Sequence, residues 1–186
     1  MTSFMYKSGI GTSSRSVEIK KKIYLLGVLV QANFGKRDQL VISGVPVGRL
    51  LGDPLPKLNF EPKKEGSLLA AIATDAPLLA HQLKRLTKRV AMGLAKVGGT
   101  ANDSSGDIFV AFSTQVPRQK GRLQVFESIP NEDIDPLFEA TIFATEEAIV
   151  NSLASAATMV GINGNEIQAL SMERVRALVS AARRVP

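Results

Sequence analysis

The chain has 186 residues, of which 45% are hydrophobic and 22% are charged, as is ordinary for one globular domain with a sizeable core. It contains no cysteine and one histidine, which excludes disulfides, a thiol nucleophile and metal sites built from thiolates or several histidines. The net charge of +6 is scattered along a chain with few aromatic residues, so nucleic-acid binding has little support. No apolar run reaches membrane-spanning length and the amino terminus lacks a signal-sequence layout, so we expect no membrane partner and a cytoplasmic location.

The first third of the chain contains one strong strand signal. Residues 8–15 are small and hydroxyl-rich, which is typical of a loop that can cradle an anion or of a plain turn. Residues 23–32 form an apolar run that predicts a buried strand, and Asn33 follows directly. An asparagine at this position can point an amide N–H at a reacting oxygen, although a turn residue is the simpler interpretation. Residues 40–44 predict a further short strand.

A Gly-Ser pair separates a linker from the next apolar run. Residues 52–65 are rich in proline and charge, Gly66 and Ser67 follow, and residues 68–73 suit a fully buried strand. A linker that feeds a Gly-Ser bond at the start of a core strand suggests self-cleavage. Cleavage would give Ser67 a free α-amino group, with a pKa of about 8, as the base that a serine nucleophile needs. Judged by pattern alone, a serine that simply begins a strand is the favoured interpretation.

Helices and strands alternate in the next part of the chain. Helical spacing of leucine and valine predicts a helix over residues 77–97, with Asp75 as its cap and a basic solvent face. A loop then leads to a strand over residues 108–114. Ser105 and Asp107 lie two residues apart at its start, so their side chains can project to the same side and orient an ammonium group. Turn chemistry explains the same two residues without function.

The last third of the chain is mainly helical. Residues 122–129 predict a strand, and Asp135 followed by Pro136 predicts a helix that runs to about residue 160. Ser171 is the expected cap of a final helix. Buried strands that alternate with long amphipathic helices predict an α/β layered fold.

Six blocks of sequence, in this order, carry a resemblance that extends over nearly the whole chain. They are GIGTSSR (9–15), GVLVQANFG (27–35), GVPVGR (44–49), GS…ATDAPLLAHQLKRL (66–86), SSGDIFVAFST (104–114) and ATIFATEEAIVNSL (140–153). Together they resemble the self-processing serine aminopeptidases of the L-aminopeptidase/D-amidase-esterase and β-peptidyl aminopeptidase type. Family members are longer, so the chain resembles their C-terminal portion.

The resemblance implies a division of the chain at the Gly66–Ser67 bond. Residues 1–66 would be the C-terminal part of the larger subunit, with residues 52–66 as the processing linker, and residues 67–186 would be the smaller subunit. Such processed heterodimers assemble into homo-oligomers in this family. The implied fold is a four-layer α/β/β/α sandwich, like that of the ornithine acetyltransferases, of which this chain would supply a part.

The resemblance also implies roles for individual residues. Ser67 would be the nucleophile, Asn33 the oxyanion-hole asparagine, and Ser105 and Asp107 the pair that orients the hydroxyl and amino groups of Ser67. The implied reaction releases N-terminal residues from small peptides, amides or esters through an acyl-enzyme, without a metal or cofactor. A tyrosine and an acidic residue that complete this site in the family have no counterpart in the chain.

Two other functions stay open at this point. One is acyl transfer to an amine, as in the ornithine acetyltransferase relatives, which use a threonine where this chain has Ser67. The other is an inactive remnant that acts only as a structural module. The first would leave an acyl product on an amine, and the second would leave the chain uncut.

Overall fold

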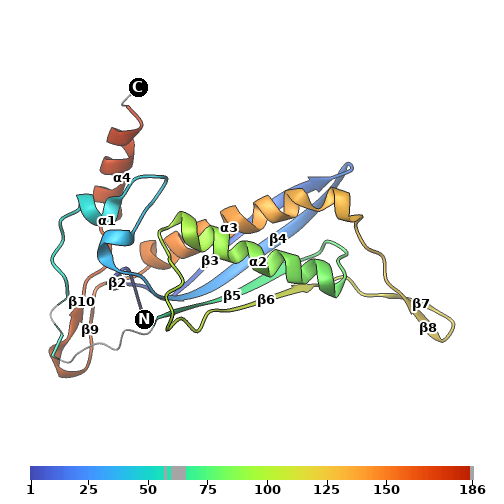
Figure 1. Cartoon of the computed structure of the whole chain (residues 1–186), viewed down its shortest axis with the longest axis horizontal. Coiled ribbons are helices and arrows are strands. Elements are labelled where there is room, and N and C mark those ends of the chain that lie inside the picture. The colour runs from blue at the N-terminus through green and yellow to red at the C-terminus, as the bar shows by residue number, and fades with distance from the viewer. Residues whose placement is uncertain (57, 60–65, 185–186) are drawn as a thin grey trace.

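A computed structural model describes residues 1–56, 58–59 and 66–184, and it is organised around one four-stranded sheet of order β3-β4-β5-β6 (Figure 1). The antiparallel strands β3 (Ile10–Ile19), β4 (Lys22–Asn33) and β5 (Ser67–Thr74) are neighbours, and β6 (Ile108–Ser113) runs parallel to β5. The connection from β5 to β6 passes through a helix, as a parallel pair requires.

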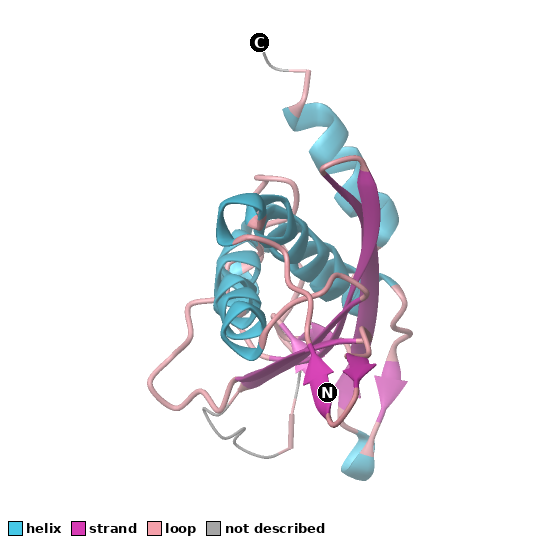
Figure 2. Cartoon of the chain, turned by 90° about the vertical axis from the view of Figure 1, so that its right-hand side faces the viewer, coloured by secondary structure: helices cyan, strands magenta, loops and turns pink. Residues whose placement is uncertain are grey.

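Two helices cover one face of this sheet (Figure 2). They are α2 (Ala80–Lys96) and α3 (Asp135–Ala154). Alternate residues of the central strands point toward them, which is why Val28 and Val30 of β4 and Ile72 of β5 are buried. The predicted α/β layering is therefore confirmed.

The opposite face of the sheet is apolar and exposed. The large hydrophobic side chains on this open face are 39–65% accessible, and they are Ile10, Ile23, Leu25, Leu29, Leu69, Ile108, Val110 and Phe112. A sheet normally buries its apolar face against another layer, and two packed sheets lie about 10 Å apart. The described chain thus supplies one helix layer and one sheet of the four-layer sandwich that the sequence predicted.

Short elements lie at the two ends of the sheet. They are β1 (Thr2–Ser3), β2 (Tyr6–Lys7), η1 (Arg37–Gln39), α1 (Val47–Leu50), β7 (Arg118–Lys120), β8 (Leu123–Val125), η2 (Asn131–Asp133), β9 (Met159–Val160), η3 (Ile162–Gly164), β10 (Glu166–Ile167) and α4 (Met172–Ala182). The β7–β8 hairpin extends from one end of the molecule, and α1, α4 and the β9–β10 hairpin gather at the other (Figure 1). Ser171 caps α4 as predicted, because its hydroxyl accepts the N–H of Arg174.

Two predicted elements differ in kind or extent from those observed. Residues 40–44 do not form a ladder strand, because Ser43 (φ 52°) and Gly44 (φ 78°) make a tight turn closed by an isolated bridge between Ile42 and Val45. Helix α2 begins at Ala80 rather than near residue 77. Asp75 does not cap it, since its carboxylate accepts the backbone N–H of Leu25 at 2.7 Å and ties the loop to β4.

The predicted boundaries in the last third were also too wide. The observed strand within residues 122–129 is limited to Leu123–Val125. Helix α3 ends at Ala154 rather than near residue 160, because the following residues belong to the β9–β10 hairpin. Asn163 and Gly164 adopt positive φ there, and an Asn-Gly pair is a strong hairpin signal.

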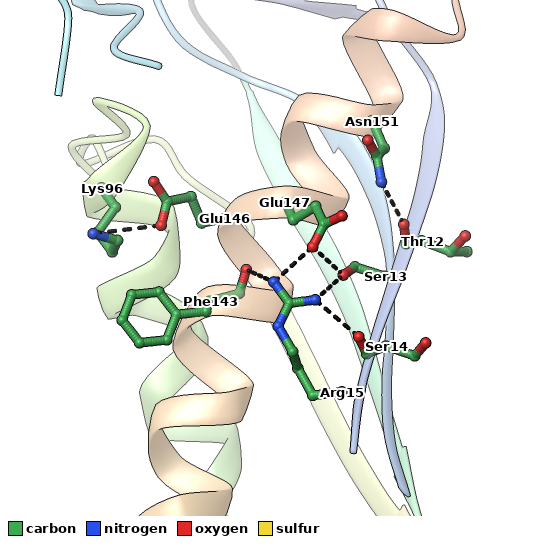
Figure 3. Close-up of polar contacts among 9 residues, drawn as sticks. All are labelled: Thr12, Ser13, Ser14, Arg15, Lys96, Phe143, Glu146, Glu147 and Asn151. Carbon is green, nitrogen blue, oxygen red and sulfur yellow. Dashed lines mark hydrogen bonds and ion pairs between the residues drawn. The ribbon is translucent and has the colours of Figure 1, made fainter. Parts of the chain in front are cut away.

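The loop expected at residues 8–15, interpreted as an anion cradle or as a plain turn, is wrong, because most of this segment is strand β3. The hydroxyl of Ser13 donates to Glu147 Oε2 of α3 at 2.8 Å, and Arg15 Nη2 pairs with the same oxygen at 2.6 Å (Figure 3). These contacts, led by the hydrogen bond from Ser13, lower the pKa of Glu147. The hydroxyl and guanidinium groups of the block therefore bind a carboxylate of the chain's own helix.

Gly11 lets α3 approach the sheet closely. A Cβ at this position would lie 1.9 Å from the carbonyl oxygen of Ala148 and 2.6 Å from the backbone nitrogen of Ser152. Both are backbone atoms of α3, so the clash can be relieved only by moving the helix. The same helix carries Glu147, and its seat on β3 depends on this glycine.

We expect Gly11→Ala to lower the free energy of unfolding by about 3 kcal/mol, because the added methyl group overpacks the β3–α3 contact. Urea denaturation followed by circular dichroism measures this change. Gly9→Ala is the matched control, since its Cβ would meet only the end of the Met1 side chain at 3.9 Å. Equal stabilities for the two variants would contradict this account of the packing.

Candidate active site

The predicted nucleophile and oxyanion residue lie directly opposite each other in the sheet. Asn33 is the last residue of β4, Ser67 is the first residue of β5, and the two are paired in the antiparallel register. Side chains at directly opposed positions have Cβ atoms about 5 Å apart on the same face. Their neighbours Ala32 and Leu68 are fully buried, so Asn33 and Ser67 both lie on the open face. Each is partly buried.

The residue before Ser67 is pressed against the end of β4. A Cβ on Gly66 would lie 2.9 Å from the backbone oxygen of Asn33 and 3.2 Å from Cα of Phe34. This close approach leaves room for glycine and not for a larger residue without a shift of backbone. The Gly66–Ser67 peptide bond is therefore held beside Asn33.

Ser105 and Asp107 reach the same edge of the sheet from the loop before β6. Because β6 is parallel to β5, with Ile108 opposite Leu69, the residues that precede each strand meet at one edge. Asp107 Oδ1 accepts the backbone N–H of Leu68 at 2.7 Å. The strand pairing thus brings all four predicted residues to the same end of the sheet, and the Asp107 carboxylate holds the backbone next to Ser67.

A small cavity lies beside these residues. Its volume is ≈ 20 Å³, and its lining includes Phe34, Ser105 and Asp107. A cavity of this size holds about one water molecule. A larger hollow of ≈ 590 Å³, lined by Pro77, Phe112 and others, lies at the opposite end of β6. The small cavity, and not the larger hollow, therefore lies at the end of the sheet that carries the predicted site residues.

A contact at Asn33 was not predicted from the sequence. Its Oδ1 accepts the backbone N–H of Thr2 at 3.0 Å, and Thr2 belongs to the β1–β2 hairpin. Residues 1–7 carry no clear pattern. No sequence signal marks the contact, because every residue except proline has the same backbone donor.

The start of the predicted processing linker is anchored rather than free. The hydroxyl of Tyr6 donates to Asp53 Oδ2 at 2.7 Å, and Arg174 of α4 pairs with the same carboxylate. Burial, reinforced by the bond to Asp53, raises the pKa of Tyr6 to about 12, so its hydroxyl remains a donor at neutral pH. Burial alone would raise the pKa of Asp53, but hydrogen bonds from Tyr6 and Arg174 outweigh it and lower the pKa.

A second anchor holds the linker at Asn59. Its backbone N–H donates to Asn165 Oδ1 at 2.6 Å, and its Nδ2 donates to the carbonyl of Asn163 at 2.9 Å. Linker residues 57 and 60–65 lie outside the described residues. Both anchored linker residues, Asp53 and Asn59, thus bind residues in the C-terminal part of the chain.

Neither a metal centre nor a membrane segment is found in the described ranges. No group of three or more His, Cys, Asp or Glu side chains there could hold a metal ion. No helix among the described residues is both long and apolar enough to cross a bilayer.

Comparison with known proteins gives consistent matches. Residues 1–167 match peptidase family S58. The chain is 44% identical over 199 aligned residues to the β-peptidyl aminopeptidase BapA of Sphingosinicella microcystinivorans, which covers 100% of this chain and 50% of that protein. The chain therefore spans about half the length of the curated relatives it matches.

Solved structures show the same relationship. A protein of Pyrococcus horikoshii OT3 superposes with a TM-score of 0.87 at 42% identity, covering 100% of this chain and 50% of that one. The L-aminopeptidase D-Ala-esterase/amidase of Ochrobactrum anthropi gives a TM-score of 0.86 at 37% identity, covering 100% and 51%. The latter is described as a prototype for the serine aminopeptidases and a new variant of the Ntn hydrolase fold. The sequence match and the shared fold agree, and the chain belongs to peptidase family S58.

Proposed function

We propose that this chain carries the nucleophile of a serine aminopeptidase that cuts itself between Gly66 and Ser67. The observation that carries the proposal is the placement of Ser67 opposite Asn33, with Gly66 pressed on the backbone of Asn33 and Phe34. Family membership and the aminopeptidase relatives support the same activity.

Self-cleavage follows from the position of the scissile bond. Ser67 Oγ attacks the carbonyl carbon of Gly66, and the acyl group passes from nitrogen to oxygen as the Gly66–Ser67 peptide bond breaks. The hydroxyl proton ends on the nitrogen, which becomes the free α-amine of Ser67. Water then hydrolyses the ester, which leaves a carboxylate on Gly66 and restores the Ser67 hydroxyl. The Asn33 amide, an N–H donor beside the bond, would stabilise the oxyanion.

The mature site would use the new amino group as its base. The α-amine of Ser67 takes the proton of the hydroxyl as Oγ attacks a substrate carbonyl, and it returns that proton to the leaving amine. The acyl-enzyme is then hydrolysed by water. Asp107, which holds the N–H of Leu68, fixes the backbone beside Ser67, and Ser105 would contact the hydroxyl or the amine. No cofactor is needed for these steps.

The contacts across the cut support a processed heterodimer. Strand β4 lies before the Gly66–Ser67 bond and β5 lies after it, and the two strands are paired. The anchors at Asp53 and Asn59 also join residues before the bond to residues after it. We propose that residues 1–66 and 67–186 stay associated after cleavage and that such heterodimers form a homo-oligomer. The substrates would be small peptides, amides or esters.

An aminopeptidase should require a free amine on its substrate. We expect the purified protein to release p-nitroaniline from amino-acid p-nitroanilides at least about 10-fold faster than from their N-acetylated forms, because a site that binds a free amine leaves its own polar groups unpaired when that amine is acetylated. Absorbance at the nitroaniline band measures both rates. Equal rates would contradict an aminopeptidase, and transfer of the acyl group to an added amine in place of water would favour an acyltransferase.

A further inference from the structure

We propose that the backbone N–H of Thr2 orients the Asn33 carboxamide for catalysis, so that the β1–β2 hairpin is part of the active site. The inference deepens the proposed function and rests on it. It assigns a positioning role to a group that contacts neither the nucleophile nor a substrate. The role is to hold one end of the amide so that the other end faces the reacting carbonyl.

The contact settles which end of the amide is held. The Thr2 nitrogen lies 3.0 Å from Asn33 Oδ1. A backbone N–H can only donate, so the atom that it contacts must be the oxygen of the carboxamide and not its NH₂ group. The NH₂ group lies at the other end of the same planar unit.

Thr2 and Ser67 lie on different sides of β4. The edge of β4 away from β5 is contacted by the amino-terminal segment, since Gly9 accepts the N–H of Ala32 and Phe4 donates to the carbonyl of Phe34. Thr2 approaches Asn33 from this same segment. Ser67 lies on the other side, in β5. In this proposal the carboxamide, with its oxygen held on the side of Thr2, directs its NH₂ group toward the side of Ser67.

The hairpin that carries Thr2 is itself firmly held. The hydroxyls of Ser3 and Ser8 are hydrogen-bonded at 2.8 Å, and both residues are almost completely buried. The buried guanidinium of Arg37 donates to the carbonyls of Phe4 at 3.0 Å and Met5 at 2.6 Å. These bonds fix the hairpin backbone, so the Thr2 N–H is a preorganised donor.

Preorganisation of this kind matters for an oxyanion donor. An asparagine side chain rotates about two torsions, and its terminal torsion is broad and roughly two-fold. Without the bond from Thr2, the amide could present its oxygen to the developing negative charge, which would oppose the reaction. A fixed dipole needs no reorganisation as the charge develops.

A proline substitution tests the role of the N–H directly. Thr2→Pro removes the donor, and proline is tolerated at an edge of extended backbone. Thr2→Ala removes the side chain and keeps the N–H. We expect Thr2→Pro to lower kcat by about 10- to 100-fold with KM nearly unchanged, as for a misplaced catalytic group. Thr2→Ala keeps the donor, so its kcat should exceed that of Thr2→Pro by at least about 10-fold. Equal kcat values for the two variants would overturn the proposal.

A double-mutant cycle separates positioning from general damage. If the Thr2 N–H acts through Asn33, adding Thr2→Pro to Asn33→Ala should lower kcat no further. A further 10-fold loss in the double variant would show that proline disturbs the site by another route and would overturn the proposal. Loss of activity in Ser67→Ala is measured beside it, so that failure of the proposed function is recognised separately.

Hydrogen exchange provides a test that does not depend on the proline variant. The Thr2 amide proton should be protected in the unmodified protein and should exchange at least about 10-fold faster in Asn33→Ala, because the acceptor is gone. Equally fast exchange in both proteins would show that the bond is not formed, and would overturn the proposal.

Discussion

Replacing Ser67 by alanine is expected to leave the chain uncut at the Gly66–Ser67 bond and to abolish peptidase activity. The variant lacks the hydroxyl that would attack both the Gly66 carbonyl and the substrate carbonyl, and an uncut chain also lacks the amino group proposed as the base. Removing a nucleophile of this kind lowers kcat on the order of 10⁴-fold or more. Gel mobility reports cleavage, and p-nitroanilide hydrolysis reports activity.

The matched control for this substitution is Ser16→Ala. Ser16 is an exposed residue of β3 on the same face of the sheet, opposite Leu25 and remote from the end of β4. It should be cut and active to the same extent as the unmodified protein. Full activity in Ser67→Ala would refute the assignment of the nucleophile, whatever the state of the chain.

The second large effect is expected at Asn33. Asn33→Ala removes the amide beside the proposed scissile bond, and losing one oxyanion donor typically lowers kcat by about 10²–10³-fold. KM should change little, because the contact is made mainly in the transition state. Self-cleavage should slow as well, since in the proposed mechanism the same donor stabilises the oxyanion formed from the Gly66 carbonyl. Steady-state kinetics and the time course of cleavage measure the two effects.

Two further variants show whether the effect at Asn33 comes from loss of its amide donor. Asn33→Asp keeps the shape of the side chain and its acceptor for the Thr2 N–H but lacks a donor, so it should be as impaired as Asn33→Ala. Asn151→Ala removes an asparagine of α3 that donates to the carbonyl of Thr12 at 2.9 Å. Its kcat should be unchanged. An active Asn33→Asp variant would contradict the oxyanion role.

The sequence was sufficient to predict the layering and the strands beside which the candidate site residues lie. Apolar runs at 23–32, 68–73 and 108–114 predict three strands, and all three pair in the sheet. The site residues fall at strand ends, and the antiparallel and parallel pairings of β5 bring those ends to one edge. The roles of the individual residues stay predictions.

Contacts made by backbone groups could not be predicted. The Thr2 N–H on Asn33 and the Leu68 N–H on Asp107 use donors that nearly every residue possesses, so no residue type marks them. The loop prediction for residues 8–15 was wrong for a related reason. Small and hydroxyl-bearing residues suit a loop, but here Gly11 and Ser13 serve the close contact with α3, which only the fold reveals.

The contacts of the linker could not be predicted from the sequence either. Proline and charge predict an extended segment, and nothing local predicts that Asp53 and Asn59 bind residues more than 100 positions away in sequence. These anchors matter for the account, because they join both sides of the proposed cut. A cut chain held in this way would remain folded as one unit.

The most direct test of self-processing is peptide mapping of the purified protein by mass spectrometry, with sequencing of any new amino terminus. We expect two fragments, one ending at Gly66 and the other beginning at Ser67, that co-purify under native conditions. Recovery of the Gly66–Ser67 bond intact in essentially all molecules would contradict self-processing at this site.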